Sequence, residues 1–154
     1  MDLRDRIGEA LKQAMRDKAA LRLSTLRLIN AAIKDRDIVL RGEGKEGPAG
    51  DEDVLAILMR MVKQRQESAR AYEEGGRLEL AEAELAEIAV IEEFLPRQLS
   101  AEESAEAVEA AIAATGASSI RDIGKVMAEL KARYAGQMDF GAAGGVVKAK
   151  LSGK

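Results

Sequence analysis

Apolar residues recur every three or four positions along most of this chain, and this spacing constrains the fold more than any other feature. A helix has about 3.6 residues per turn, so the spacing puts apolar side chains on one face that must pack against another helix. Only 2 of the 154 residues are proline and 3% are aromatic, while Ala, Leu, Glu, Lys and Arg dominate. The sequence therefore predicts an all-α protein.

Residues 1–94 contain four such segments, which together predict an N-terminal helical bundle. The first begins at Leu3, and the second ends near Leu40, before a glycine-rich stretch over residues 42–50 that predicts an exposed loop. Asp51 follows this loop and is expected to be the N-cap of the third helix, because a carboxylate there can accept hydrogen bonds from free backbone N–H groups.

The fourth segment, residues 77–93, is rich in Ala, Glu and Leu. Its glutamates favour a solvated face over a metal site, because a carboxylate-bridged metal bundle normally also uses His, and the chain has 0 His. The candidates for its core face are Leu78, Leu80, Leu85, Ile88, Val90 and Ile91.

Pro96 is the best candidate for a domain boundary, since proline cannot continue a helix. We therefore predict an N-terminal helical domain over residues 1–94 and a small three-helix tail domain over residues 95–154. Ser100 with Glu103 has the form of a capping box that opens the first tail helix.

Two further capping signals predict the other tail helices: Ser119 with Asp122, and Asp139. Residues 140–148, FGAAGGVVK, superficially suggest a phosphate-binding loop, but they lack its spacing and a preceding strand. Small residues that let a short helix approach its neighbours are the favoured interpretation. Each glycine there also weakens the helix by roughly 1 kcal/mol relative to Ala.

The composition removes much of the usual catalytic chemistry. With 0 Cys and 0 His, the chain has neither a thiolate nucleophile nor an imidazole base or ligand. Its serines show no nucleophile-elbow or Ser-x-x-Lys pattern. We predict no catalytic residue, no metal site and no cofactor. Charged residues throughout positions 1–18, and the lack of any long apolar run, predict a cytoplasmic protein without membrane contact. The oligomeric state is not indicated.

The charge distribution points to a different kind of activity. The net charge is -3, yet residues 115–154 carry 7 basic and 3 acidic groups. Ordinary surface lysines explain this pattern, and so does a surface that contacts RNA phosphates. The basic residues are Arg121, Lys125, Lys131, Arg133, Lys148, Lys150 and Lys154.

Three stretches taken together resemble the YqeY family, whose tail domain is similar to the tRNA-binding end of the GatB subunit of tRNA-dependent amidotransferases. They are LRLINAAIK at residues 26–34, IEEFLPRQLS at 91–100, and IGKVMAEL at 123–130 continuing as GQMDFGAAGGVVKAKL at 136–151. The resemblance implies an all-helical protein with a three-helix tail. It also implies a link to translation, through carbon–nitrogen ligase activity with glutamine as amido-N-donor. The kinase-like catalytic part of GatB and its amidase partner have no counterpart in this chain.

The resemblance implies that the tail contacts tRNA, with amidotransferase or other translation components as further partners. The motif positions carried over, together with the basic residue Arg133, give these candidate RNA-binding residues: Gly124, Lys125, Lys131, Arg133, Gly136, Lys148 and Lys150. Two alternatives stay open. The chain takes part in amide transfer itself, or it is a protein-interaction module that uses its acidic and apolar helical surfaces.

Overall fold

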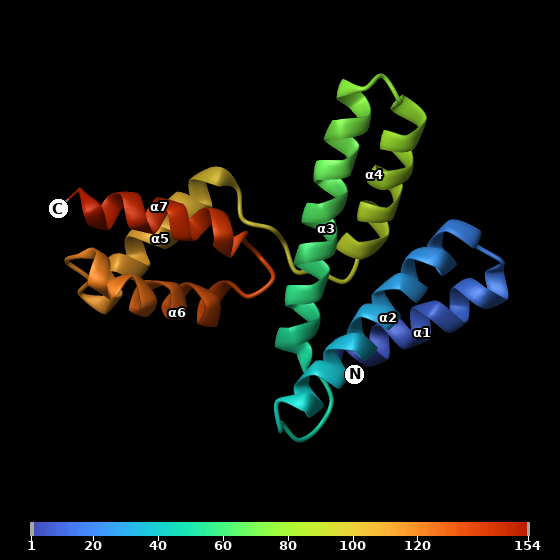
Figure 1. The fold of residues 1–154 in the computed structure, drawn as a ribbon, viewed down its shortest axis with the longest axis horizontal. Helices are drawn as coiled ribbons and strands as arrows, with labels where there is room; N and C mark the ends of the chain where they lie inside the picture. The colour runs from blue at the N-terminus through green and yellow to red at the C-terminus, as the bar shows by residue number, and fades with distance from the viewer. Residues whose placement is uncertain (1, 154) are drawn as a thin grey trace. The chain divides into compact units, whose positions relative to one another are not determined.

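The computed structural model describes residues 2–153 and contains, in that range, seven α-helices and no strand (Figure 1). The predicted all-α fold class is confirmed. The chain divides into two compact units, Met1–Leu95 and Pro96–Lys154. None of the helices in residues 2–153 is both long enough and apolar enough to cross a bilayer. The candidate basic residue Lys154 lies outside the described residues.

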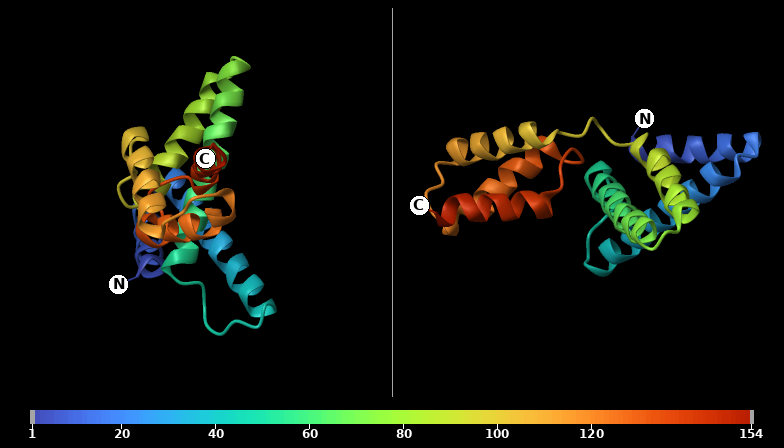
Figure 2. Two further views of the ribbon diagram at one scale, coloured as in Figure 1. Left: turned by 90° about the vertical axis from the view of Figure 1, so that its left-hand side faces the viewer. Right: turned by 90° about the horizontal axis from the view of Figure 1, so that it is seen from above.

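Unit 1, Met1–Leu95, is built from two helical hairpins. Helix α1 is joined to α2 by a short turn, in which Lys18 adopts the left-handed conformation at φ 53°. Helices α3 and α4 form the second hairpin and lie side by side in all views (Figures 1 and 2). The bounds are α1 Leu3–Asp17, α2 Ala20–Gly42, α3 Asp51–Glu74 and α4 Leu78–Glu92.

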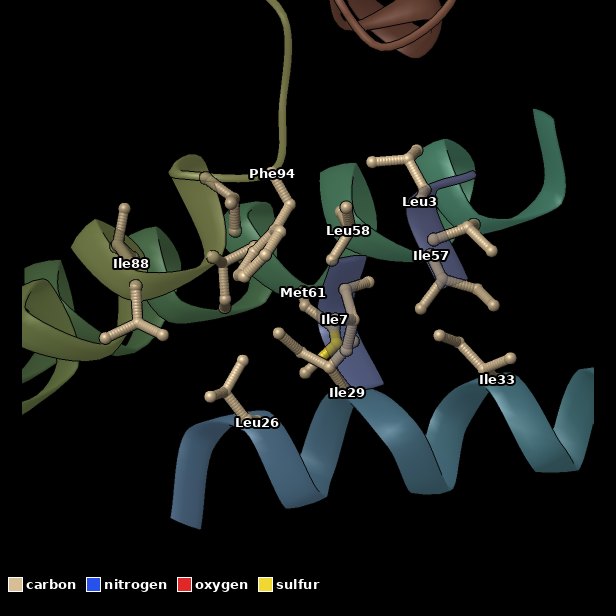
Figure 3. Packing of buried hydrophobic residues seen from close by; sticks show 14 of the residues in the cluster. Leu3, Ile7, Leu26, Ile29, Ile33, Ile57, Leu58, Met61, Ile88 and Phe94 are labelled. Atoms are coloured by element: carbon tan, nitrogen blue, oxygen red, sulfur yellow. The ribbon is translucent and has the colours of Figure 1, made fainter. Parts of the chain in front are cut away.

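The core of unit 1 lies where the two hairpins meet. Leu26, Ile29 and Ile33 of α2 are fully buried and point toward α3, as Figure 3 shows. Their spacing of three and four residues is the helical repeat that the sequence predicted. Ile7 of α1 and Phe94, after α4, complete this apolar core. Full burial of each such side chain stabilises the fold by about 1.5–3 kcal/mol.

A polar network ties the start of α1 to α2 and α3. The Arg4 guanidinium donates two hydrogen bonds to the Asp37 carboxylate, with Nη1–Oδ1 3.0 Å and Nη2–Oδ2 2.5 Å. The same carboxylate accepts a hydrogen bond from the Ala49 N–H at 2.8 Å, which holds the loop before α3. The Arg4 hydrogen bond, followed by the Ala49 N–H, lowers the pKa of Asp37 to about 2.

Asp51 does not cap its own helix. Gly50 is the N-cap of α3, and Asp51 is its first residue, so the predicted N-cap was wrong by one position. The Asp51 carboxylate instead accepts a hydrogen bond from the Leu3 N–H at 3.1 Å. Leu3 opens α1, whose first N–H groups have no partner within the helix. The Asp51 side chain, which the sequence pattern predicted as the N-cap of α3, therefore binds the start of α1 instead.

Only half of the predicted core face of α4 is buried. Ile88, Val90 and Ile91 lie in the core as predicted, whereas Leu78, Leu80 and Leu85 are exposed, which contradicts the prediction. The physical reason is the position of the hairpin turn. Figure 1 shows the turn end of α3 and α4 projecting beyond α1 and α2, so that the first turns of α4 have α3 as their only helical neighbour within unit 1.

Unit 2, Pro96–Lys154, contains the three predicted tail helices. Ser100 caps the first helix as predicted, accepting a hydrogen bond from the Glu103 N–H at 3.1 Å. Asp139 caps the last, accepting from the Gly141 N–H at 2.9 Å. The middle helix is preceded by one 3-10 turn, η1. The bounds are α5 Ala101–Thr115, η1 Ile120–Asp122, α6 Ile123–Tyr134 and α7 Phe140–Ser152.

A second, smaller core joins α5, α6 and α7. It centres on Val126, Leu130 and Val147, which are fully buried. The segment before α5 is held by Arg97, whose guanidinium donates two hydrogen bonds to Glu103, both at 2.8 Å. This contact with Arg97 lowers the pKa of Glu103 to about 2. Each unit therefore has its own apolar core and its own arginine–carboxylate pair.

The Asp37 carboxylate should make the stability of unit 1 sensitive to acid. Its pKa is lowered from 3.8 to about 2 in the folded state, so its contribution is complete above about pH 4 and is lost as the pH falls toward 2. We expect Asp37→Asn to lower the urea midpoint at neutral pH and to reduce the further loss of stability between pH 4 and 2. Urea titrations at several pH values measure this. Glu82→Gln, which changes an exposed carboxylate that forms no ion pair in residues 2–153, should leave the pH dependence unaltered.

Candidate nucleic-acid interface

The charges of unit 2 are divided between its helices. Helix α5 carries four glutamates and neither Lys nor Arg, whereas α6 and α7 together carry five basic residues and one glutamate. An anion approaching this unit is therefore repelled by α5 and attracted by α6 and α7. All five basic residues of α6 and α7 belong to the predicted RNA-binding set.

The outer face of α6 combines small residues with lysines. Gly124, Ala128 and Ala132 are exposed and follow one another at intervals of four residues, so they lie along one face of the helix. Lys125 and Lys131 are exposed on either side of this stripe. An extended phosphate backbone can approach a helix surface that carries only hydrogen atoms and methyl groups, while both ammonium groups reach its oxygens.

Three of the basic residues already have acidic neighbours. Arg133 Nε lies 2.6 Å from Glu129 Oε1, one turn earlier in α6. Lys150 Nζ lies 2.9 Å from Glu109 Oε1 of α5. This contact with Lys150 lowers the pKa of Glu109. RNA would have to displace a carboxylate to bind Arg133 or Lys150.

The third contact is looser. Lys125 Nζ lies 4.0 Å from Asp122 Oδ1, and the lysine side chain is 72% exposed. The pKa of Asp122 is lowered, mainly by hydrogen bonds from the backbone N–H groups of Ser118 and Ser119, with Lys125 a smaller cause. Asp122 is thus held by the chain itself. Lys125 can turn to another anion at little cost.

Lys131 and Lys148 are the most available of the predicted contacts. Both are exposed, and neither forms an ion pair within residues 2–153. On α7, Lys148 shares a stripe with the exposed residues Gly141 and Gly145, at intervals of four and three residues. Each of the two helices therefore presents a lysine beside small residues.

Gly136 has a different role from the other candidates. It is buried, with φ 77°, and its carbonyl accepts a hydrogen bond from Gln98 Nε2 at 2.6 Å. A positive φ suits glycine, so this residue shapes the turn between α6 and α7. Its burial leaves it no surface to offer to a ligand. The other six candidates remain at least partly exposed, and of these Gly124 has open space above it.

Gly144 and Gly145 of α7 are not needed for close packing. A Cβ atom built on Gly145 would meet nothing within 4 Å, and one on Gly144 would lie at ordinary contact distance, 3.8 Å, from Met127 Cε. The interpretation that these glycines let α7 approach its neighbours therefore does not hold at these two positions. Gly145 costs helix stability without a packing reason in unit 2.

Comparison with known proteins assigns the family. The family described as Yqey-like protein matches residues 4–151, which includes every helix but the first residue of α1 and the last of α7. The chain belongs to the YqeY family. It is also 38% identical over 86 residues to "Altered inheritance of mitochondria protein 41, mitochondrial" of Meyerozyma guilliermondii. That alignment covers 55% of this chain and 42% of the relative, so the chain spans less than half of the relative's length.

The structure explains part of the family resemblance seen in the sequence. In the stretch at residues 91–100 of this YqeY-family chain, Phe94 belongs to the core of unit 1, while the Leu99 N–H donates to the Gln137 carbonyl at 2.9 Å in unit 2. Gln137 Nε2 in turn donates to the Arg97 carbonyl at 3.2 Å. Sequence analysis missed Gln98 and Gln137, because side-chain amides carry no spacing signal that identifies such contacts.

Gly145→Ala should stabilise unit 2. Ala is favoured over Gly within a helix by about 0.8–1.0 kcal/mol, and the space above Gly145 is open. We expect the melting temperature of this unit to rise by about 4 °C or more, measured by circular dichroism. Gly116→Ala is the matched comparison, because Gly116 has φ 66° at the end of α5 and a Cβ atom is strained there. It should lower the melting temperature. Equal effects of the two variants would contradict the conclusion that Gly145, unlike Gly116, has no structural need for glycine.

Proposed function

We propose that this YqeY-family protein is a tRNA-associated accessory protein of translation, linked to tRNA-dependent amide transfer, whose unit 2 binds RNA phosphates. One observation carries the proposal: Lys131 and Lys148 stand exposed and without ion pairs in residues 2–153, beside small residues on α6 and α7. The sequence resemblance of the tail to the tRNA-binding end of GatB supplies the choice of RNA.

The surface suits recognition of shape and charge rather than of bases. Tyr134 and Phe140, the aromatic residues of unit 2, are both half-buried against its core, so stacking on bases is not their main role. Lysines beside small residues instead reach phosphate oxygens along a folded RNA. Such contacts release counterions, and affinity must fall as salt rises.

The proposal assigns no reaction to this chain alone. Residues 2–153 contain no group of three or more His, Cys, Asp or Glu side chains that could hold a metal ion. The described hollow at Gly76–Leu80 is lined by the end of the turn before α4 and the first residues of α4. We propose a role beside an enzyme that uses glutamine as amide donor. A cytoplasmic location belongs to the same proposal, and the named mitochondrial relative makes an organelle the alternative.

Replacing the two unpaired lysines should weaken tRNA binding. We expect Lys131→Glu/Lys148→Glu to reduce affinity for total tRNA at low salt by about tenfold or more, because two phosphate contacts become repulsive. The plot of log affinity against log salt concentration should become less steep, with the magnitude of its slope smaller by about two. Filter binding over a range of salt concentrations measures both quantities.

A matched control keeps the net charge change the same. Lys12→Glu/Arg60→Glu reverses two exposed basic residues of unit 1. On a logarithmic scale, it should lower the affinity for tRNA by less than half as much as Lys131→Glu/Lys148→Glu does. Equal losses in the two double variants would contradict an RNA site on α6 and α7. Formation of Gln-tRNA by the isolated chain from Glu-tRNA, glutamine and ATP would contradict the accessory role.

A protein-interaction role is the second candidate, and the exposed leucines of α4 favour it. Leu78 and Leu85 are seven residues apart, on one face of the helix, and Glu82 lies between them without an ion pair in residues 2–153. A basic amphipathic helix would fit this acidic and apolar face. The natural chain should then capture a protein partner even after nuclease treatment, and Leu78→Ser/Leu85→Ser should abolish this capture. Capture that is unchanged in this variant would remove α4 as the contact surface.

A further inference from the structure

Helix α2 presents apolar side chains to solvent beside its buried face. Leu21, Leu28 and Val39 are 46%, 48% and 48% exposed, and their spacing of 7 and 11 residues keeps them on one side of the helix. Ile38, 63% exposed, lies about 100° farther round the helix, on the side away from the buried face. Four of the larger exposed apolar side chains therefore lie on the outer surface of α2, which unit 1 does not cover.

Two opposite charges on the outer surface of α2 form no ion pair in residues 2–153. Arg27 and Asp35 are exposed, and neither forms an ion pair within the part of the chain that the structure describes. Neither has an opposite charge three or four residues away, since those positions hold apolar, Ser or Asn residues. At eight residues apart along the helix, the two cannot meet each other. Each charge is available to another molecule.

The positions of these charges are symmetric about the centre of the helix. Helix α2 spans Ala20–Gly42, so Ala31 is its midpoint, and Arg27 and Asp35 each lie four residues from it. In two antiparallel copies that cross at Ala31, Arg27 of each copy comes opposite Asp35 of the other. Ala31 is exposed and small, so it allows two helices to approach closely at the crossing point.

We propose that two copies of this chain associate through the outer face of α2, as an antiparallel, two-fold symmetric pair. A second copy is the occupant because the charge pattern complements itself, which an isologous interface requires. The exposed leucines, Ile38 and Val39 supply the apolar surface, and two Arg27–Asp35 contacts fix the register. The inference does not depend on RNA binding by unit 2.

The association should be weak and dependent on concentration. A helix of 23 residues is about 34 Å long, and one helix pair buries less surface than the standard interface of about 1,600 Å². We therefore expect a monomer–dimer equilibrium in the micromolar range. Sedimentation velocity of the full chain over a series of concentrations measures it.

Charge reversal tests the pairing directly. Arg27→Asp alone brings two carboxylates together at each contact, and Asp35→Arg alone brings two guanidinium groups together, so each variant should dimerise at least about tenfold more weakly. In the mixed pair of an equimolar mixture of the two variants, each contact joins a carboxylate of one chain to a guanidinium group of the other, so the mixture should associate more strongly than either variant alone. The double variant Arg27→Asp/Asp35→Arg restores the pairing within one kind of chain, because both of its contacts again join opposite charges. We expect the double variant to associate within a few-fold of the natural chain.

Two further variants separate this inference from a general effect of charge. Arg60→Asp, a reversal at an exposed α3 residue without an ion pair in residues 2–153, should leave the equilibrium unchanged. Leu28→Arg should weaken it, and circular dichroism should show unaltered helix content in every variant. A natural chain that stays monomeric at the highest concentration would overturn the proposal. So would a double variant that associates no better than either single reversal.

Discussion

Burial of one face of α2 is the interaction on which unit 1 depends. Leu26, Ile29 and Ile33 are fully buried, and α1, α3 and α4 each contact α2. Each of these side chains stabilises the fold by about 1.5–3 kcal/mol, a large part of the net stability of a small domain. The two hairpins share this face, so α2 fixes where α3 begins and hence where Asp51 can reach Leu3.

Helical spacing predicted the elements of the fold but not the depth at which each was buried. The seven α-helices of residues 2–153 followed from apolar residues at intervals of three and four, because that interval indicates a buried face. The same rule failed for Leu78, Leu80 and Leu85, since spacing shows which residues share a face and not whether another element covers it. It also missed that Asp51 serves the neighbouring helix, because the Leu3 N–H is 48 residues away.

The sequence predicted which basic residues make up the candidate interface, but not which of them are already held in ion pairs. Sequence alone identified the basic residues of α6 and α7, since the charge of a side chain follows from its residue type. Which of them are occupied depends on tertiary neighbours: Glu109, 41 residues before Lys150, holds that lysine. Gly136 was chosen by likeness to a family motif, and its buried turn shows that a glycine can mark a backbone requirement instead of a ligand contact.

The proposed RNA-binding surface of unit 2 and the proposed dimer surface of α2 depend on different forces. Together they imply that dimerisation would strengthen RNA binding. Contacts of Lys131 and Lys148 with phosphate are screened by salt, whereas the apolar face of α2 is affected much less. Two chains joined through α2 would carry two tails. After one tail binds an RNA, the other would act at a high effective concentration, and two weak contacts would combine into a stronger one wherever the linkage spans both sites. Loss of the α2 contact would then weaken RNA binding without touching a residue of unit 2.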